Sequence, residues 1–161
     1  MVNHTDKGGS CMYLQANSIE KYYGDKEARV QVLNGISCEI AQGEICVLLG
    51  PSGSGKSTLL NLIGGIEHID KGELLVGGKD LAKLPDKELA LYRRSTLGFI
   101  FQSYHLVDNL SVKENIESGA YLGRHPKSVD ELLKRLGLSQ HQNKYPNQLS
   151  GGQQHLRAIG R

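Results

Sequence analysis

The amino-acid sequence predicts an α/β fold, and three observations lead to that prediction. A short apolar run, Ile45–Leu49, is bounded by glycines and is typical of a buried parallel strand. A glycine-rich loop follows it and leads into a helical pattern over Lys56–Ile63. From Ser111 onward the residue pattern favours helices. A strand–loop–helix unit followed by a mainly helical segment indicates an α/β core with a helical insertion.

Four further strands and one further helix are expected before residue 111. Met12–Ile19 and Gly35–Ile40 alternate loosely between apolar and polar residues, as half-buried antiparallel strands do. Gly72–Val76 and Leu97–Phe101 also read as strands, and a helix is expected over Asp86–Arg94 between them.

The segment after residue 110 carries the start and stop signals of several helices. Ser111–Glu114 and Ser128–Glu131 both match the capping box, in which the serine hydroxyl binds a first-turn amide and the glutamate reaches back. Gly137 is expected to end the second of these helices. A last helix is expected from about Gly152.

Composition indicates a globular chain and argues against several classes of function. Of the 161 residues, 39% are hydrophobic and 22% are charged, which is enough apolar material for one core. The net charge of +2 is too small to indicate a nucleic-acid partner, so none is expected. No apolar run reaches the length of a membrane span. An odd number of cysteines without a secretory signal favours a cytoplasmic location. The cysteines are Cys11, Cys38 and Cys46.

The expected organisation is a short tail and one domain in two parts. Residues 1–11 are polar and are expected to form a disordered tail. Residues 12–110 are expected to hold a β subdomain and the core around the glycine-rich loop. Residues 111–161 are expected to form a helical subdomain that ends in the last helix.

The glycine-rich loop matches the phosphate-binding pattern G-x-x-x-x-G-K-[ST]. Glycines allow successive backbone amides to turn inward around an anion, and the following helix N-terminus favours the same anion. Lys56 would add a positive charge at the β- and γ-phosphates, and the Ser57 hydroxyl would bind Mg²⁺. The predicted ligand is therefore a nucleoside triphosphate with Mg²⁺. The candidate contacts are Gly50, Pro51, Ser52, Gly53, Ser54, Gly55, Lys56, Ser57 and Thr58.

The alternative is a glycine-rich loop that matches by chance. At average residue frequencies the pattern would occur in roughly one chain in two hundred of this length. The strand before the loop and the helix after it are also the context that the motif requires. We therefore interpret the loop as a nucleotide site.

Further motifs resemble the ATP-binding subunits of ABC transporters. Leu149–Gln153 is similar to their signature motif, and Phe99–Gln102 resembles the strand-end glutamine of their Q-loop. Tyr22–Gly24, followed by Val32–Ser37, resembles the opening that carries their adenine-stacking aromatic residue. The resemblance covers about residues 12–161 and implies a P-loop ATPase core with an antiparallel β subdomain and a helical subdomain.

Within this family, two stretches look most like the lipoprotein-release and the macrolide- or antimicrobial-peptide-export branch. They are Leu59–Glu67 and Leu97–Ile116.

The resemblance assigns roles to individual residues. Tyr23 would stack on the adenine, since the family aromatic usually stands directly before this glycine, which makes Tyr22 the second choice. An ordinary half-buried tyrosine remains the alternative for Tyr23. Gln102 would contact Mg²⁺ or the attacking water. The signature residues would bind, in trans, the γ-phosphate of an ATP held by a second subunit. The two subunits would form a head-to-tail dimer with ATP between them. The residues for that contact are Ser150, Gly151, Gly152 and Gln153.

The sequence also departs from the family pattern. Leu156 stands at a usual arginine position, and Gly160 replaces alanine inside a helix at a cost of roughly 1 kcal/mol. The Walker B strand with its catalytic glutamate, and the switch histidine, would follow the signature. Val129–Glu131 is the nearest match to Walker B, but it lies in an expected helix. The 161 residues are therefore expected to be the N-terminal part of the domain, able to bind nucleotide without efficient hydrolysis.

The expected function is energy coupling in a membrane transporter. The full-length subunit would be an ATP hydrolase that acts at the inner face of the cell membrane through a permease partner. Two alternatives stay open. One is a non-catalytic nucleotide-binding fragment from truncation or frameshift. The other is a soluble ABC protein of DNA repair or translation, although such chains usually carry paired cassettes or long coiled-coil insertions.

Overall fold

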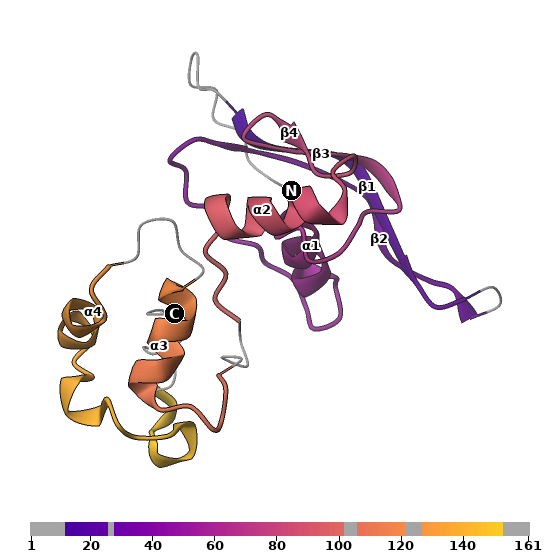
Figure 1. Ribbon diagram of the computed structural model, residues 1–161. Coiled ribbons are helices and arrows are strands. Elements are labelled where there is room, and N and C mark those ends of the chain that lie inside the picture. The colour runs from indigo at the N-terminus through magenta and orange to yellow at the C-terminus, as the bar shows by residue number, and fades with distance from the viewer. Residues whose placement is uncertain (1–11, 26–27, 102–105, 122–126, 153–161) are drawn as a thin grey trace. The chain divides into compact units, whose positions relative to one another are not determined.

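The protein forms two compact units, residues 1–93 and residues 94–161. The computed structural model describes residues 12–25, 28–101, 106–121 and 127–152 (Figure 1). The expected tail at residues 1–11 lies outside the described residues, and the boundary expected at residue 110 stays a prediction. No helix in these described ranges is long and apolar enough to cross a membrane.

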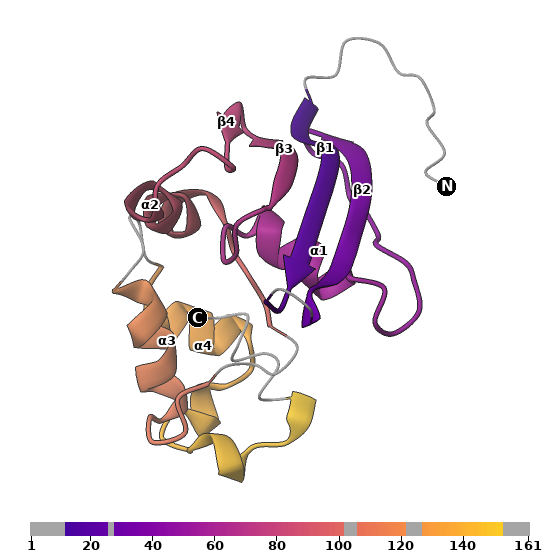
Figure 2. The ribbon, with the colours of Figure 1, turned by 90° about the vertical axis from the view of Figure 1, so that its right-hand side faces the viewer.

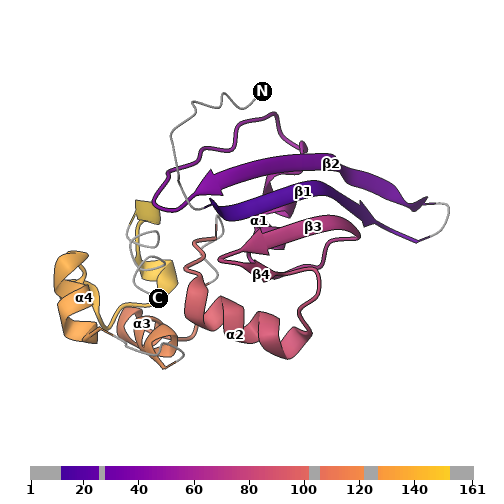
Figure 3. The same cartoon turned by 90° about the horizontal axis from the view of Figure 1, so that it is seen from above.

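The N-terminal unit contains a four-stranded antiparallel sheet with the order β2-β1-β3-β4 (Figure 3). Its strands are β1 (Met12–Tyr23), β2 (Val30–Ala41), β3 (Lys71–Val76) and β4 (Lys79–Asp80). The strands predicted at 12–19, 35–40 and 72–76 are confirmed. The first two are longer than predicted, because β1 and β2 continue to pair as far as Tyr23 and Val30.

A bulge in β1 sets which of its side chains face the core. Strict alternation after the buried Leu14 and Ala16 would turn Ser18 inward. The register instead shifts between Ala16 and Ile19, and Ser18 adopts a φ of 49°. Ile19 is consequently fully buried. The neighbouring strand tolerates the bulge only through Gly72, where a Cβ would lie 2.5 Å from the Ser18 carbonyl oxygen.

Two helices pack with this sheet. Helix α1 (Lys56–Ile63) has the predicted bounds and lies beside the sheet (Figure 2), with Leu59 and Leu62 buried. Helix α2 (Asp86–Thr96) confirms the helix predicted at 86–94. Tyr92 on α2 donates to the Ile63 carbonyl oxygen at 2.8 Å, and burial raises the pKa of Tyr92 to about 12.

The strands predicted at Ile45–Leu49 and Leu97–Phe101 are wrong for the chain as described. Neither segment has strand structure, and neither pairs with the four strands of the sheet. Ile45 and Leu49 are 92% and 85% exposed. A parallel strand exists only while neighbours accept its ladder hydrogen bonds and cover both faces. No other segment in the described ranges supplies them here.

We expect this exposed apolar segment to cause self-association of the 161-residue chain. Exposed backbone with apolar side chains pairs readily with another copy. Val47→Lys places a charge in the middle of the segment. It should raise the concentration at which association begins several-fold. Light scattering over a concentration series measures this. A wild-type chain that stays monomeric throughout would contradict the prediction.

The C-terminal unit is a small helical domain. It contains α3 (Val112–Ala120), α4 (Val129–Arg135), and two short 3₁₀ helices, η2 (Ser139–His141) and η3 (Pro146–Gln148). One buried apolar cluster joins these elements. Its members are Val112, Ile116, Leu133, Leu138 and Leu149.

Only one of the two predicted capping boxes forms. The Ser111 hydroxyl accepts from the Glu114 amide, and the Glu114 carboxylate accepts from the Ser111 amide at 2.7 Å. These bonds to Ser111 hold the pKa of Glu114 below its ordinary value. The box predicted at Ser128 is wrong, since the Ser128 side chain makes no capping bond. The Glu131 carboxylate pairs instead with Arg135, one turn along the same helix, at 2.7 Å.

Candidate functional site

The predicted phosphate loop is exposed and leads directly into α1. Gly53 and Gly55 have φ angles of 77° and 82°, which a residue with a side chain rarely adopts. The two glycines turn the backbone between the exposed segment before the loop and the first turn of α1. Backbone conformation thus explains glycine at positions 53 and 55.

Gly55 also fixes the loop against the sheet. A Cβ at this position would lie 2.6 Å from Leu33 Cδ2 and 3.0 Å from the Val32 carbonyl oxygen. Leu33 is buried in β2. The start of α1 therefore lies close against β2 at Gly55, where only a residue without a side chain fits.

Lys56 turns back across the loop. Its ammonium Nζ donates to the carbonyl oxygens of Gly50 and Pro51, at 2.8 and 2.7 Å. It also lies 3.4 Å from Ser54 Oγ. The positive charge is thus placed over the loop rather than out in solvent.

The electrostatics of this helix start favour an anion. The first turn of α1 has no acidic residue and no side-chain capping bond. Lys56 adds a cation at the helix end where the dipole is already positive. A bound phosphate would offset both charges and accept from first-turn amides. These residues fit a nucleotide phosphate group.

Mg²⁺ has few protein ligands here. Ser57 is exposed on the first turn of α1, and no group of three or more His, Cys, Asp or Glu side chains that could hold a metal occurs within the described part of the chain. A metal at this loop would therefore depend on nucleotide oxygens and water, as Mg²⁺ commonly does. Gln102, the other predicted ligand, lies outside the described residues.

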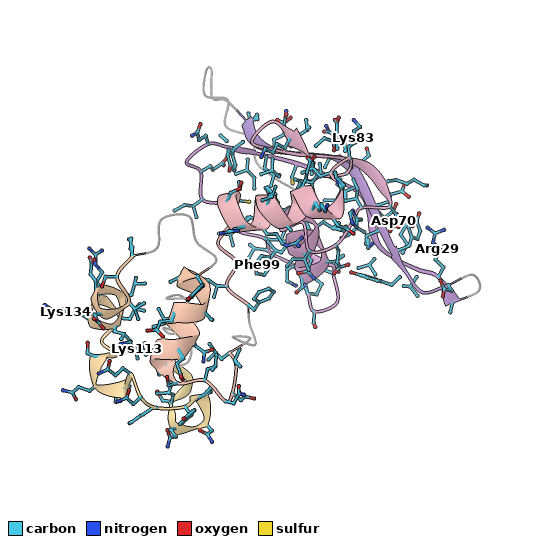
Figure 4. The ribbon with its side chains drawn as sticks, viewed as in Figure 1. Arg29, Asp70, Lys83, Phe99, Lys113 and Lys134 are labelled. Carbon is cyan, nitrogen blue, oxygen red and sulfur yellow. The ribbon has the colours of Figure 1, made fainter. Side chains whose placement is uncertain are left out.

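The two adjacent tyrosines at the end of β1 have different surroundings. The Arg29 guanidinium lies 4.1 Å from the ring centroid of Tyr22, and the Tyr22 hydroxyl donates to Glu20 at 2.6 Å. Figure 4 labels Arg29 beside this end of the strand. The bond to Glu20 raises the pKa of Tyr22. Tyr23 is 41% exposed, and its hydroxyl donates to the carboxylate of Glu67, which follows α1 in the chain. Tyr23 is the more exposed of the two tyrosines.

Glu67 was not identified from the sequence. Its carboxylate accepts from the Tyr23 hydroxyl and, at 2.8 Å, from the Asn61 side-chain amide on α1. It follows the glycine pair that ends α1, where sequence patterns indicate only a loop. No spacing rule connects it with Tyr23, which lies 44 positions earlier.

The predicted signature residues begin a helix at the surface of the C-terminal unit. Leu149 is buried in the apolar cluster, and Ser150 directly precedes helical residues Gly151 and Gly152. All three residues after Leu149 are exposed. A Cβ on either glycine would meet no heavy atom of the described chain within 4 Å. Packing within the described chain therefore does not require glycine there. Gln153 lies outside the described residues.

Comparison with known proteins agrees with these features. A family model described as "ABC transporter" matches residues 33–161. The chain is 41% identical to the bacitracin export ATP-binding protein BceA of Halalkalibacterium halodurans, over 92% of this chain and 60% of that protein. It is 43% identical to the macrolide export ATP-binding/permease protein MacB 1 of Aeromonas hydrophila, over 92% of this chain and 24% of that protein. The chain thus spans less than two thirds of the length of either relative.

The fold comparison gives the same result. The chain superposes with a TM-score of 0.82 and 35% identity on the ATP-binding cassette MJ0796, in a dimeric post-hydrolysis state bound to ADP and Pi. That match covers 91% of this chain and 67% of the cassette. The predicted α/β fold class of the ABC ATPase type is confirmed. The chain belongs to the ABC transporter ATP-binding domain family.

Proposed function

We propose that this protein is the ATP-binding, energy-coupling subunit of an ABC transporter, in an export system. The observation that carries the proposal is the phosphate loop. Left-handed glycines at 53 and 55 lead into the uncapped start of α1, and Lys56 folds back over the loop. This arrangement leaves backbone amides and one ammonium group to bind a triphosphate.

Each residue of the loop has a definite task in this proposal. Backbone amides of residues 50 and 52–58 bind the phosphates. Lys56 exchanges its bonds to loop carbonyls for phosphate oxygens, and Ser57 holds Mg²⁺, with Gln102 as the second contact. The metal supplies charge neutralisation at the β- and γ-phosphates. Tyr23 orients the adenine by stacking.

The signature residues are proposed to act on a second copy of the subunit. Ser150, Gly151, Gly152 and Gln153 would bind the γ-phosphate of ATP held by the partner, in a head-to-tail homodimer. Among the described residues, no atom would crowd a Cβ on either glycine, which supports close approach of another molecule. The similar cassette MJ0796 is itself a dimer.

The remaining partner is proposed to be a transmembrane permease. BceA is described as an export ATP-binding protein, and MacB 1 as an export ATP-binding/permease protein. The subunit would accordingly work on the cytoplasmic side of the membrane and change the permease conformation through its helical unit. The full-length form would hydrolyse ATP.

We expect the 161-residue chain to bind MgATP with little turnover. No acidic residue of this sequence follows an apolar strand after the signature. A fusion that continues past Arg161 with the corresponding segment of BceA should hydrolyse ATP at least about 100-fold faster, since a positioned general base contributes about that much. Calorimetric titration measures binding, and phosphate release measures turnover.

The fusion also separates the possible failures. Absence of MgATP binding by both proteins would overturn the nucleotide site itself. Mg-dependent turnover by the 161-residue chain, equal to that of the fusion, would show a catalytic base among these residues. A Lys56→Ala version of the fusion serves as the inactive control for contaminating ATPases.

A further inference from the structure

Glu67 connects the end of β1 with α1. One carboxylate oxygen accepts from the Tyr23 hydroxyl, and the other accepts from Asn61 Nδ2 at 2.8 Å. Asn61 lies on α1, the helix that begins with Lys56. The chain of contacts therefore runs from the tyrosine ring to the helix that follows the phosphate loop.

Tyr23 lies where β1 stops and would be poorly fixed by packing alone. The residue is 41% exposed, and the next residue, Gly24, leaves the strand with a φ of 84°. An exposed tyrosine can sample several χ1 rotamers. A hydrogen bond at the far end of the ring, together with the backbone at the near end, fixes both ends of the side chain and leaves only rotation about χ2.

A second contact holds the same stretch of strand. Lys21 donates from its ammonium to the His68 carbonyl oxygen at 2.7 Å, next to Glu67. Its Nζ also lies 5.5 Å from the Tyr23 ring centroid and 3.6 Å from the Asp70 carboxylate. One side of the ring therefore faces Lys21, so a base would stack on the opposite face.

Burial and the bond to Glu67 favour the protonated, donating form of the phenol. Burial raises the pKa of Tyr23, the bond to Glu67 raises it further, and the Thr58 hydroxyl opposes the shift. Tyr23 thus remains protonated at neutral pH and can donate to the carboxylate.

We propose that Glu67 is a positioning residue for the nucleobase: by accepting from Tyr23 and Asn61 together, it holds the tyrosine ring in a fixed place relative to α1. This inference rests on the proposed stacking of adenine on Tyr23. Glu67 itself acts through the tyrosine rather than on the nucleotide. Its contribution is preorganisation, because a fixed ring loses less rotamer freedom when a base stacks on it.

The test compares a ligand that has a base with one that lacks it. MgATP and magnesium tripolyphosphate are titrated into the wild-type 161-residue chain and into five variants. The variants are Tyr23→Phe, Tyr23→Ala, Glu67→Leu, Glu67→Gln and the double variant Tyr23→Phe/Glu67→Leu. Tyr23→Phe keeps the ring and removes the bond to Glu67. Tyr23→Ala removes the stacking surface.

Glu73→Leu is the matched control. Glu73 is also a partly exposed glutamate of the N-terminal unit that accepts from an asparagine amide, Asn17 Nδ2 at 3.2 Å. Its hydrogen-bond partner is on the sheet and not at Tyr23. Circular dichroism of every variant checks that the fold is retained.

We expect Tyr23→Phe and Glu67→Leu each to weaken MgATP binding about fivefold, with tripolyphosphate binding changed by less than about twofold. The double variant should be no weaker than either single variant, because both remove the same interaction. Glu67→Gln keeps an acceptor and should lie closer to wild type. Glu73→Leu should bind both ligands as wild type does.

Other results overturn specific claims. If Tyr23→Ala weakens MgATP binding while Tyr23→Phe and Glu67→Leu do not, stacking stands and the role of Glu67 is wrong. Equal losses for tripolyphosphate would mean that Glu67 supports the phosphate loop and does not position the base. If Tyr23→Ala has no effect, the stacking that underlies the inference is wrong.

Discussion

Replacing Lys56 with alanine is expected to weaken MgATP binding by about 100-fold, or about 3 kcal/mol. The ammonium is the full positive charge that bonds directly to the loop carbonyls, at 2.7–2.8 Å. Without it, only backbone amides and the helix dipole remain to offset the charge of the triphosphate. Titration with MgATP measures the loss. Tripolyphosphate should lose as much, because the missing contact is to phosphate.

The control for Lys56 removes the same charge elsewhere in the N-terminal unit. Lys83, labelled in Figure 4, pairs with Asp80 at 2.7 Å and is largely exposed. Lys83→Ala should change MgATP affinity by less than about twofold, since an exposed charge contributes little at a distance. If both substitutions weaken binding equally, net charge controls affinity and the placement of Lys56 does not matter.

Replacing Asn115 with leucine is expected to destabilise the C-terminal unit by about 3 kcal/mol. Asn115 is fully buried at the middle of α3. Its Oδ1 accepts from the Val107 amide at 2.9 Å. Its Nδ2 donates to the carbonyl oxygens of Val107, Leu110 and Ser111 at 3.0–3.1 Å. Leucine has a similar size but would remove the partner of the Val107 amide and of the Leu110 carbonyl oxygen. The carbonyl oxygens of Val107 and Ser111 would keep only their bonds from the Leu110 and Asn115 amides.

Hydrogen exchange locates this effect. Amides of α3 should exchange much faster in Asn115→Leu than in wild type, while amides of β1 and β3 should keep their protection. Asn109→Leu is the control, because Asn109 is exposed in the loop that Asn115 holds. Unchanged exchange in α3 would show that the network contributes no net stability.

The local elements near the phosphate site could be predicted from the sequence. Helix α1 has the predicted bounds, because Gly55 and the Gly64–Gly65 pair set both of its ends within a few residues. The phosphate-loop motif was identified for the same reason, since it can be recognised from residues 50–58 alone. The capping box at Ser111 also depends on one turn of chain.

Predictions that depended on a distant partner were less successful. Ile45–Leu49 has the composition of a buried strand, but composition cannot supply the neighbouring strands that a parallel sheet requires. One local prediction failed as well. The Ser128 side chain makes no capping bond, and the Glu131 carboxylate pairs with Arg135 on the same helix. In both segments the residue pattern fits the predicted structure and the available partners do not.

The sequence by itself determined the family, and it predicted the phosphate loop and the choice of Tyr23 over Tyr22, all from short motifs. Only the tertiary structure decided what fixes those residues in space. Glu67 meets Tyr23 across 44 positions of sequence, and Gly72 meets the bulge at Ser18 from another strand. Such contacts arise when the chain folds and brings distant backbone together. A reading of local pattern cannot find them, because nothing in the neighbouring residues encodes the partner.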